Sequence, residues 1–431
     1  MSTHVFTELL RSDMTPSFGV TEPGAIALAV SRARSFTEGE IKSIELSVNS
    51  GIYKNSFTCG IPGTDEIGIP FAAALGAVAG DWTKGLEALG KASQLDLARA
   101  QVLLDAGKVH VELHEISSAL YINARVSAGS HTAEVTITGT HTNISSIIVD
   151  GESLIRQEAA ADEAPEPAAE SVTGHSFAEM WEYAAEIPRE EIDFIENAYK
   201  LNLALAEKGQ FSDKCTICKE LITQNGGMYS QDYLKTAHAL TAAAIEARVR
   251  GLPCPAMSIT GSGNHGIIAT LPLYACYKVK GTDWETLLRA TALSYLVTEY
   301  IKEYSGKLSA FCGCAVAAGT GSAVGLCYML GGGRSAAEAV IRNMASGITG
   351  IICTGGNPAC VMKAAAAIDI GCKSVELALS SVSIEPMHGI NGFSVEDTMR
   401  NIGRIASPGM EKTEETILAL MTEKTGRLPQ R

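Results

Sequence analysis

Alternating apolar and polar residues predict strands in two parts of the chain. Residues 41–48, IKSIELSV, set isoleucine, leucine and valine against polar neighbours, as in a strand with one buried face. Residues 108–149 contain four further runs of this kind, at 109–113, 120–126, 133–138 and 144–149. We therefore expect a mixed, mainly antiparallel sheet with helices from residues 70–106 on one face.

The remaining apolar residues follow the period of helices. Residues 1–34 predict two helices, the second entered through Glu22 and Pro23, because proline suits the first turn of a helix. Gly- and Ala-rich helices follow in residues 61–107, and the chain after residue 175 is helical almost throughout. The fold class expected is α+β: a mainly α-helical C-terminal domain, joined by the N-terminal helices, with an inserted α/β domain that contains the mixed, mainly antiparallel sheet.

An acidic segment rich in alanine and proline separates the two patterns. Residues 157–174, QEAAADEAPEPAAESVTG, contain no aromatic residue, which is typical of a linker. We expect N-terminal helices in residues 1–40 that pack with the helical domain. The inserted sheet domain is expected in residues 41–156 and the helical domain in residues 175–431.

The composition limits which binding partners and which cellular location we expect. The 431 residues are 46% hydrophobic and 19% charged, and a net charge of −14 argues against nucleic acid or an anionic membrane as a partner. The uncharged run at 312–330 has the length of a membrane span, but small residues dominate it, so we expect it to pack inside the protein. Eleven cysteines and no apolar export signal near the N-terminus predict a reducing, cytoplasmic location. The oligomeric state stays open, with a homodimer as one alternative.

Cysteines are concentrated in residues 308–363, which hold five of the eleven. Cys353 and Cys360 flank a turn that contains two glycines and a proline, and Cys312 opens the uncharged run. Cys360 falls in the first turn of a predicted helix, where the helix dipole favours a thiolate. We predict that the three cysteines meet and bind an iron–sulfur cluster, with ordinary buried cysteines as the alternative. Three thiolates leave one iron of a four-iron cluster without a protein ligand, and such an iron can act as a Lewis acid.

A further pair of cysteines has metal-ligand spacing. Cys215 and Cys218 form a C-x2-C pair, but no second pair matches it. On a helix the two thiols would lie one turn apart. The pair alone is therefore a weak indication of redox or metal chemistry.

Two helix N-termini carry residues suited to binding a carboxylate. Thr21 and Glu22 begin the second N-terminal helix, where they could bind a substrate or serve as an ordinary cap. Ser262, Gly263 and Asn264 lie in the run GSGNHG, whose glycines let backbone N–H groups face an anion. We expect these three residues to hold the carboxylate or ammonium group of a substrate. The run is not a phosphate-binding loop, because the lysine-containing ending of such loops is missing.

Three side chains are candidates for the base of a proton-transfer step. Lys54 could act as a base in a buried setting, although most lysines are solvated. His141 lies between two predicted strands and His265 follows the glycine-rich run, and an imidazole exchanges protons near pH 7. Their polar neighbours are candidate substrate-binding residues: Asn55, Thr142 and Asn143. For the His141 segment the alternative is a hairpin turn with local hydrogen bonds.

Several of these runs together resemble one protein family. LSAFC at 308–312 and GIICTGGNPACVMK at 350–363 resemble the C-terminal signature of the L-cysteine desulfidase family, which is related to the α-chain of the iron–sulfur L-serine dehydratases. The same family resemblance extends, in the same order, to GVTEP at 19–23, PGT at 62–64, GTHTNI at 139–144, GSGNHG at 261–266 and the Lys-Asn pair at 54–55.

The resemblance implies a chemistry as well as a fold. It implies an oxygen-sensitive [4Fe–4S] cluster on Cys312, Cys353 and Cys360, in a helical catalytic domain. It also implies β-elimination from a small amino acid without pyridoxal phosphate: L-cysteine to pyruvate, ammonia and sulfide. The alternatives are an L-serine dehydratase, a lyase for another β-substituted amino acid, and a non-catalytic relative. The substrate is expected in a cleft between the sheet domain and the helical domain.

One position departs from the family. Its first motif usually carries cysteine, thought to take part in catalysis, where this chain has Val20. Valine can neither move a proton nor bind iron. The sequence leaves three alternatives: another residue is the base, the substrate differs, or the activity has been lost.

Overall fold

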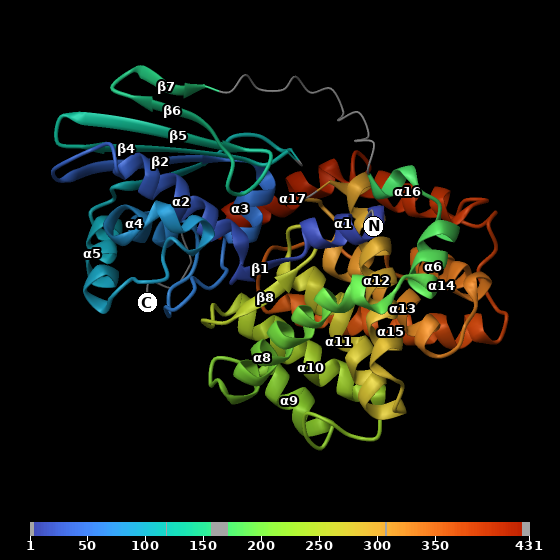
Figure 1. The fold of residues 1–431 in the computed structure, drawn as a ribbon. Coiled ribbons are helices and arrows are strands. Elements are labelled where there is room, and N and C mark those ends of the chain that lie inside the picture. Colours follow the sequence, from blue (N-terminus) through green and yellow to red (C-terminus); the bar gives the residue numbers. More distant parts are fainter. Residues whose placement is uncertain (1–3, 118, 157–170, 307, 425–431) are drawn as a thin grey trace.

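The computed structural model describes residues 4–117, 119–156, 171–306 and 308–424. Most of the predicted linker, residues 157–170, lies outside the described residues, and residues 172–174 form a short 3-10 helix. Figure 1 shows the sheet at one side of the molecule and the larger helical part at the other. The α+β fold class is confirmed.

Along the chain, the strands of the large sheet come first, up to Arg156, and helices make up most of the chain from residue 171 on. The strands are β1 (Thr15–Phe18), β2 (Ile41–Val48), β3 (Val109–Leu113), β4 (Tyr121–Ala128), β5 (His131–Thr138), β6 (Ile144–Val149), β7 (Glu152–Arg156) and β8 (Pro255–Ser258). The helices up to the glycine-rich run are α1 (Val5–Asp13), α2 (Thr21–Arg34), α3 (Ser50–Ser56), α4 (Ile69–Ala79), α5 (Gln94–Asp105), α6 (Phe177–Glu186), α7 (Arg189–Ile192), α8 (Glu196–Phe211), α9 (Ile217–Gln224) and α10 (Tyr233–Val249). The later helices are α11 (Gly263–Lys280), α12 (Trp284–Ser305), the π-helix η4 (Cys314–Ala318), α13 (Gly319–Met329), α14 (Arg334–Ile348), α15 (Ala359–Leu379), α16 (Val395–Ala406) and α17 (Glu411–Thr422).

The large sheet has the strand order β3-β2-β4-β5-β6-β7. β2 and β3 are parallel, and the other neighbours are antiparallel, which confirms a mixed, mainly antiparallel sheet. The predicted strands correspond to β2 through β6. The edge strand β7 was not predicted, because it is short and lacks the alternation of a half-buried strand. Its two aliphatic side chains, Leu154 and Ile155, are both exposed.

The second N-terminal helix packs on the sheet, in contrast to our prediction that residues 1–40 join the helical part. Ala25, Ile26 and Val30 of α2 share an apolar core with the strands; α2 and α4 lie against one face of the sheet, and α5 packs on α4 (Figure 1). The prediction failed because α2 is buried on nearly all sides. Its sequence therefore has no apolar stripe that would indicate which element it packs against. By contrast, Phe6 and Leu10 of α1 belong to the core of the helical part, as expected.

Glycines let the central helices of the helical part approach closely. A Cβ added to Gly321 would lie 2.2 Å from the Ser294 carbonyl oxygen, and one added to Gly325 would lie 2.7 Å from that of Ala290. The uncharged run at 312–330 therefore packs inside the protein, as predicted, and its neighbour there is α12. Within the described residues no helix is long and apolar enough to cross a membrane.

A short two-stranded ribbon joins the N-terminal segment of the chain to the segment before α11. β1 pairs antiparallel with β8, so the end of α1, which precedes β1, lies beside the glycine-rich run that follows β8, and the Thr260 N–H donates to the Asp13 carboxylate. Both strands have four residues and contain a proline, which is why no strand was predicted there. Ser50–Ser56, for which the sequence pattern predicted no element, form the helix α3.

Candidate active site

Residues from both parts of the molecule line one small cavity. Its volume is about 80 Å³, and its walls come from the N-terminus of α2, from α3, from the β8–α11 turn and from the segments that carry Cys312, Cys353 and Cys360. A cavity of this size suits a ligand of a few heavy atoms.

Cys312 and Cys353 are brought together by a short antiparallel bridge. The Cys312 N–H donates to the Ile351 carbonyl oxygen at 2.7 Å, and the Cys353 N–H donates to the Ala310 carbonyl oxygen at 2.8 Å. Both side chains line the cavity and belong to the same small apolar cluster. Two backbone hydrogen bonds thus join segments that are far apart in the sequence.

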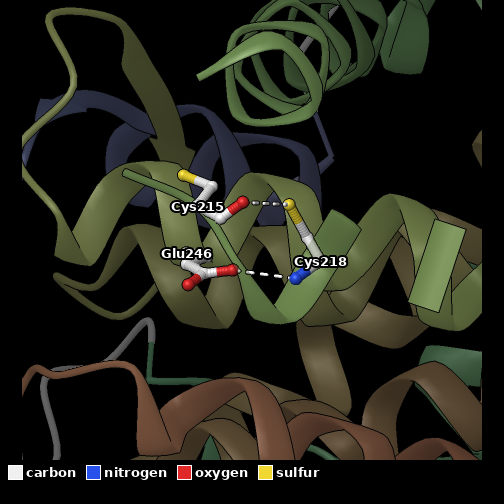
Figure 2. Close-up of side chains that lie close together, drawn as sticks. All are labelled: Cys215, Cys218 and Glu246. Carbon is white, nitrogen blue, oxygen red and sulfur yellow. Dashed lines mark hydrogen bonds between the residues drawn. The ribbon is translucent and has the colours of Figure 1, made fainter. Parts of the chain in front are cut away.

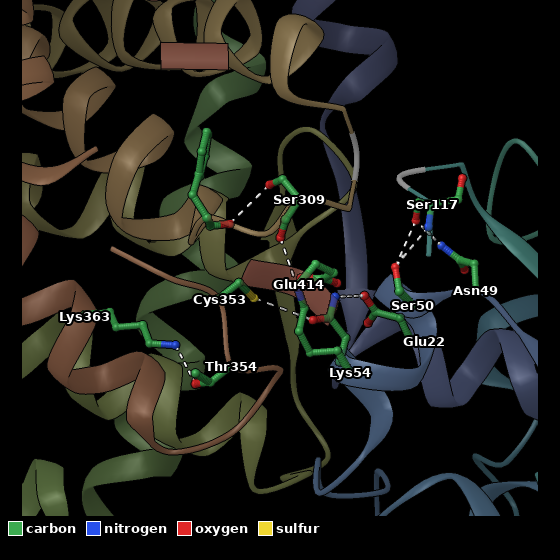
Figure 3. Close-up of polar contacts among 12 residues, drawn as sticks. Glu22, Asn49, Ser50, Lys54, Ser117, Ser309, Cys353, Thr354, Lys363 and Glu414 are labelled. Carbon is green, nitrogen blue, oxygen red and sulfur yellow. Dashed lines mark hydrogen bonds and ion pairs between the residues drawn. The ribbon is translucent and has the colours of Figure 1, made fainter. Parts of the chain in front are cut away.

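Cys360 reaches the cavity from the first turn of α15. Its N–H donates to the Asn357 carbonyl oxygen at 2.9 Å, and its thiol donates to the Gly355 carbonyl oxygen at 3.4 Å. The position in the first helical turn agrees with the sequence prediction. The Lys363 ammonium, from the next turn of α15, donates to the hydroxyl of Thr354 in the preceding segment at 2.7 Å (Figure 3).

The donor set fits an iron–sulfur cluster. A hydrogen bond from the Cys314 thiol, together with the charge of Lys363, lowers the pKa of Cys312 to about 6, so the ligating thiolate form is accessible. Burial raises the pKa of Cys360 to about 12, so this sulfur ionises only against a strong positive charge such as iron. The sulfurs of Cys312, Cys353 and Cys360 do not all lie within the 4.8 Å that suits a single ion, and a cluster relaxes this demand because each cysteine binds its own iron.

Arg248 is a cavity residue that the sequence prediction missed. Its side chain is 3% exposed, and its hydrogen bonds to Asn264, Ser17 and Thr21 are long, at 3.3–3.5 Å. Its Nε has no hydrogen-bond partner among the described residues. A buried guanidinium with spare donors beside a cavity is a ready partner for a carboxylate.

The glycine-rich run makes room for this arginine. A Cβ added to Gly263 would lie 2.4 Å from the Arg248 Nε, so glycine is required there. Ser262 and Asn264 line the cavity, and Asn264 accepts a hydrogen bond from Arg248. From the other side, Thr21 and Glu22 line the cavity at the start of α2.

Asn55 and Lys54 connect α3 with α2, with α17 and with the segment around Ser309. The Asn55 amide donates to the Glu22 carboxylate at 2.7 Å and accepts a long bond from the Cys353 thiol at 3.8 Å. The Lys54 ammonium is almost completely buried, pairs with the carboxylate of Glu414 in α17, and donates to the Ser309 carbonyl oxygen at 3.1 Å. Lys54 therefore lines the cavity as half of an ion pair, which opposes a role as a base.

His265 is set up as a neutral base. The Thr260 hydroxyl donates to the Ile259 carbonyl oxygen at 2.7 Å, so it accepts from the His265 Nδ1, 2.6 Å away. The neutral ring then carries its proton on Nδ1 and a lone pair on Nε2, which faces Gly313. Burial, with the charges of Lys302 and Arg248, holds the pKa of His265 well below its usual value.

The His141 turn contributes one of its three predicted residues to the cavity. His141 lines the cavity from the turn between β5 and β6. Thr142 and Asn143 are exposed and do not line it, and the Asn143 amide donates to the Thr138 carbonyl oxygen. This local bond matches the hairpin-turn alternative for those two residues.

Two more side chains that sequence analysis missed line the cavity. Cys314 lies beside Cys312, and Lys302 extends from α12; burial lowers the pKa of Lys302 to about 8. Val20, which occupies the position of the family cysteine, lies against Gly356 at the same cavity. A polar residue inside an apolar helical pattern is the only sequence signal that marks Lys302 and Arg248.

Comparisons with known proteins agree with these motifs. Residues 101–419 match the sequence model of the family described as "Serine dehydratase alpha chain". A UPF0597 protein of Clostridium botulinum (strain Langeland) is 42% identical over 430 residues, which cover 99% of this chain and 100% of that protein. UPF0597 proteins of Desulfotalea psychrophila and Caldanaerobacter subterraneus subsp. tengcongensis are 37% and 35% identical, over 96% and 97% of this chain and 98% of each protein.

Proposed function

The chain belongs to the serine dehydratase alpha chain family, and on this basis we propose that it is an amino-acid lyase that eliminates the β-substituent of a small L-amino acid. The substrate proposed first is L-cysteine, with pyruvate, ammonia and sulfide as products. The observation that carries the proposal is the meeting of Cys312, Cys353 and Cys360 with the buried Arg248 at one small cavity.

The three cysteines are the proposed ligands of a [4Fe–4S] cluster. When bound, a cluster with one iron free of protein ligands supplies a Lewis acid next to the substrate. The cavity would keep the cluster in surroundings that exclude bulk water, because Cys312 and Cys360 are buried.

The chain's own residues bind and orient the amino acid. Arg248, whose hydrogen bonds to the protein are long, offers its guanidinium to the substrate carboxylate, and Ser262 extends the same binding surface. The carboxylate of Glu22, held by the Asn55 amide, is suited to the substrate ammonium group. These contacts fix the Cα–H bond relative to the base.

His265 is the base proposed for the α-proton. Its Nε2 accepts the proton while the Cα–H electrons form the Cα–Cβ double bond, and the β-substituent leaves with its electron pair as hydrosulfide. The product, 2-aminoacrylate, tautomerises and is hydrolysed by one water molecule to pyruvate and ammonia. A base at His265 removes the need for a cysteine at the position of Val20. His141 and Lys54 stay weaker candidates.

L-serine is the second candidate substrate, because the matched family is described as a serine dehydratase chain. Its elimination uses the same residues and releases water in place of sulfide. A non-catalytic relative remains the third alternative, since Val20 replaces the family cysteine.

Anaerobic purification and product analysis test the proposal. A brown protein with about four irons per chain that forms sulfide and pyruvate from L-cysteine supports the first candidate. Ammonia and pyruvate from L-serine, without activity on L-cysteine, support the second. Reconstituted protein that binds iron and yields neither product would support the non-catalytic alternative. Unchanged iron content in each of the Cys312→Ala, Cys353→Ala and Cys360→Ala variants would refute the ligand assignment.

A further inference from the structure

A second group of metal-ligand side chains lies in the helical part, away from the catalytic cavity. Cys218 lies in the first turn of α9, Cys215 precedes that helix by two residues, and Glu246 comes from α10 (Figure 2). One ligand atom from each side chain lies within 4.8 Å of the other two, and all three residues are buried. None of the three lines the cavity described above.

The three groups concentrate negative charge in a buried place. The Glu246 side chain is fully buried, and the guanidinium of Arg250, the cation that pairs with it, lies 3.7 Å away. Without a further cation, ionising the thiols beside this carboxylate is unfavourable. A divalent metal ion removes that penalty.

The carboxylate is already held in a fixed orientation. One Glu246 oxygen accepts the Thr216 N–H at 3.1 Å, and the other accepts the Cys218 N–H at 2.8 Å (Figure 2). Each carboxylate oxygen has two lone pairs, so each can also face a metal ion. Backbone hydrogen bonds of this kind orient metal ligands in proteins.

We propose that Cys215, Cys218 and Glu246 bind a structural zinc ion. Two thiolates and one carboxylate carry three negative charges, which the ion and the neighbouring Arg250 together balance. Paired thiolates select soft or borderline metals, and zinc takes thiolate and carboxylate ligands in tetrahedral sites. The fourth ligand is a water molecule or the Gly209 carbonyl oxygen, which lies 3.7 Å from the Cys218 sulfur. Zinc release would leave the anionic thiol–carboxylate group in the core.

A redox-active disulfide is the competing use of a C-x2-C pair at a helix N-terminus. Such pairs need one accessible sulfur of high nucleophilicity. Cys215 and Cys218 are both fully buried, so neither sulfur is accessible to a partner thiol. The surroundings therefore suit a bound ion better than thiol–disulfide exchange.

The zinc ion would tie α9 to the end of α10 that carries Arg248. Glu246 precedes Arg248 by two residues on that helix, so the ion would fix the helix end from the side opposite the cavity. This role is independent of the lyase proposal, because it needs neither the cluster nor a substrate.

Metal analysis of the full-length protein tests the zinc site. We expect about one zinc ion per chain in protein purified anaerobically from zinc-supplemented cells. Cys215→Ser and Cys218→Ser are expected to keep less than about a tenth of that zinc, because loss of a ligand weakens binding strongly, with iron content unchanged. Cys276→Ser, at an equally buried cysteine in the same core, is the matched control and keeps its zinc.

A measurement on the unaltered chain covers the case in which the variants fail to fold. Cobalt(II) added to zinc-depleted wild-type protein is expected to give a near-ultraviolet thiolate-to-cobalt absorption band. Wild-type protein without zinc and without this band would overturn the proposal. So would a mass two hydrogens lower in zinc-free protein, which indicates a disulfide, or a parallel loss of iron in Cys215→Ser, which would assign the pair to the cluster.

Discussion

Arg248 combines burial, charge and long hydrogen bonds in one side chain. It is 3% exposed, lines the cavity and makes only long hydrogen bonds to Asn264, Ser17 and Thr21, so a substrate carboxylate would strengthen its hydrogen bonding. Lysine at this position keeps a charge but cannot form the forked pair. We expect Arg248→Lys to lose about 2 kcal/mol of substrate binding, about a 30-fold rise in KM with a smaller change in kcat.

The comparison that isolates the carboxylate uses cysteamine, which has the thiol and amine of cysteine but no carboxylate. Binding of cysteamine, measured as competitive inhibition, should be equal in wild type and Arg248→Lys. The control is Arg250→Lys, two residues along, whose side chain does not line the cavity. Equal KM values for wild type and Arg248→Lys would contradict the assignment.

Thr260 determines which nitrogen of His265 carries the proton. Its hydroxyl is 2.6 Å from the His265 Nδ1, and its backbone has the unusual positive φ of 52°. Thr260→Val keeps the shape but removes the acceptor, so the neutral ring no longer favours a lone pair on Nε2. We expect kcat to fall about 10-fold, with KM little changed, and Thr260→Ser to restore it. A buried threonine whose hydroxyl bonds a helix backbone, Thr320, provides the control variant Thr320→Val.

Sequence reasoning found the residues of the cavity that stand in short, unusual motifs. Ser262, Asn264 and the three cysteines belong to runs of glycine or cysteine that no ordinary helix or strand needs. Arg248 and Lys302 sit inside regular helices, where an arginine or lysine normally indicates the solvent face. Only the tertiary packing, which buries those faces against the cavity, distinguishes them from surface residues.

Among the helices, α11 depends on a glycine in its first turn. A Cβ added to Gly266 would lie 1.9 Å from the Met257 carbonyl oxygen of β8, and backbone cannot yield as a flexible side chain can. Gly266→Ala should therefore lower the free energy of unfolding by about 2–3 kcal/mol, the cost of overpacking a closed core. Urea denaturation of the cofactor-free protein would measure it. Gly333→Ala, where an added Cβ meets nothing within 4 Å, should be near neutral.

Elements with strong periodicity could be predicted from the sequence, and short ones could not. The strands β2 through β6 and the long helices α10, α12 and α15 carry patterns of many residues. β1 and β8 have four residues each and exist because they pair with each other, which a local pattern does not contain. The helix α3 was missed because serine, asparagine and glycine are weak helix formers, and its stability comes from burial against both parts of the molecule.

The whole molecule is held around the cavity by contacts between its two parts. α17, near the end of the chain, lies beside α3 (Figure 1), and the Lys54–Glu414 ion pair joins them with side chains that are 1% and 8% exposed. We predicted a substrate cleft between the sheet domain and the helical domain. Contacts such as this ion pair hold the two parts together around the cavity, and they join residues hundreds of positions apart in the sequence. The domain boundaries at residues 156 and 174 remain a prediction.

A double-mutant cycle on this pair separates a structural from a catalytic Lys54. Removing one partner leaves an uncompensated buried charge, so Lys54→Met and Glu414→Leu should each lower the free energy of unfolding by about 3–5 kcal/mol. The double variant replaces both charges with apolar groups and should regain most of that loss. If Lys54 serves only the pair, elimination activity should recover together with stability in the double variant. Recovery of stability without activity would instead identify Lys54 as the base and displace His265 from that role, because the folded cavity would then lack only the lysine amine.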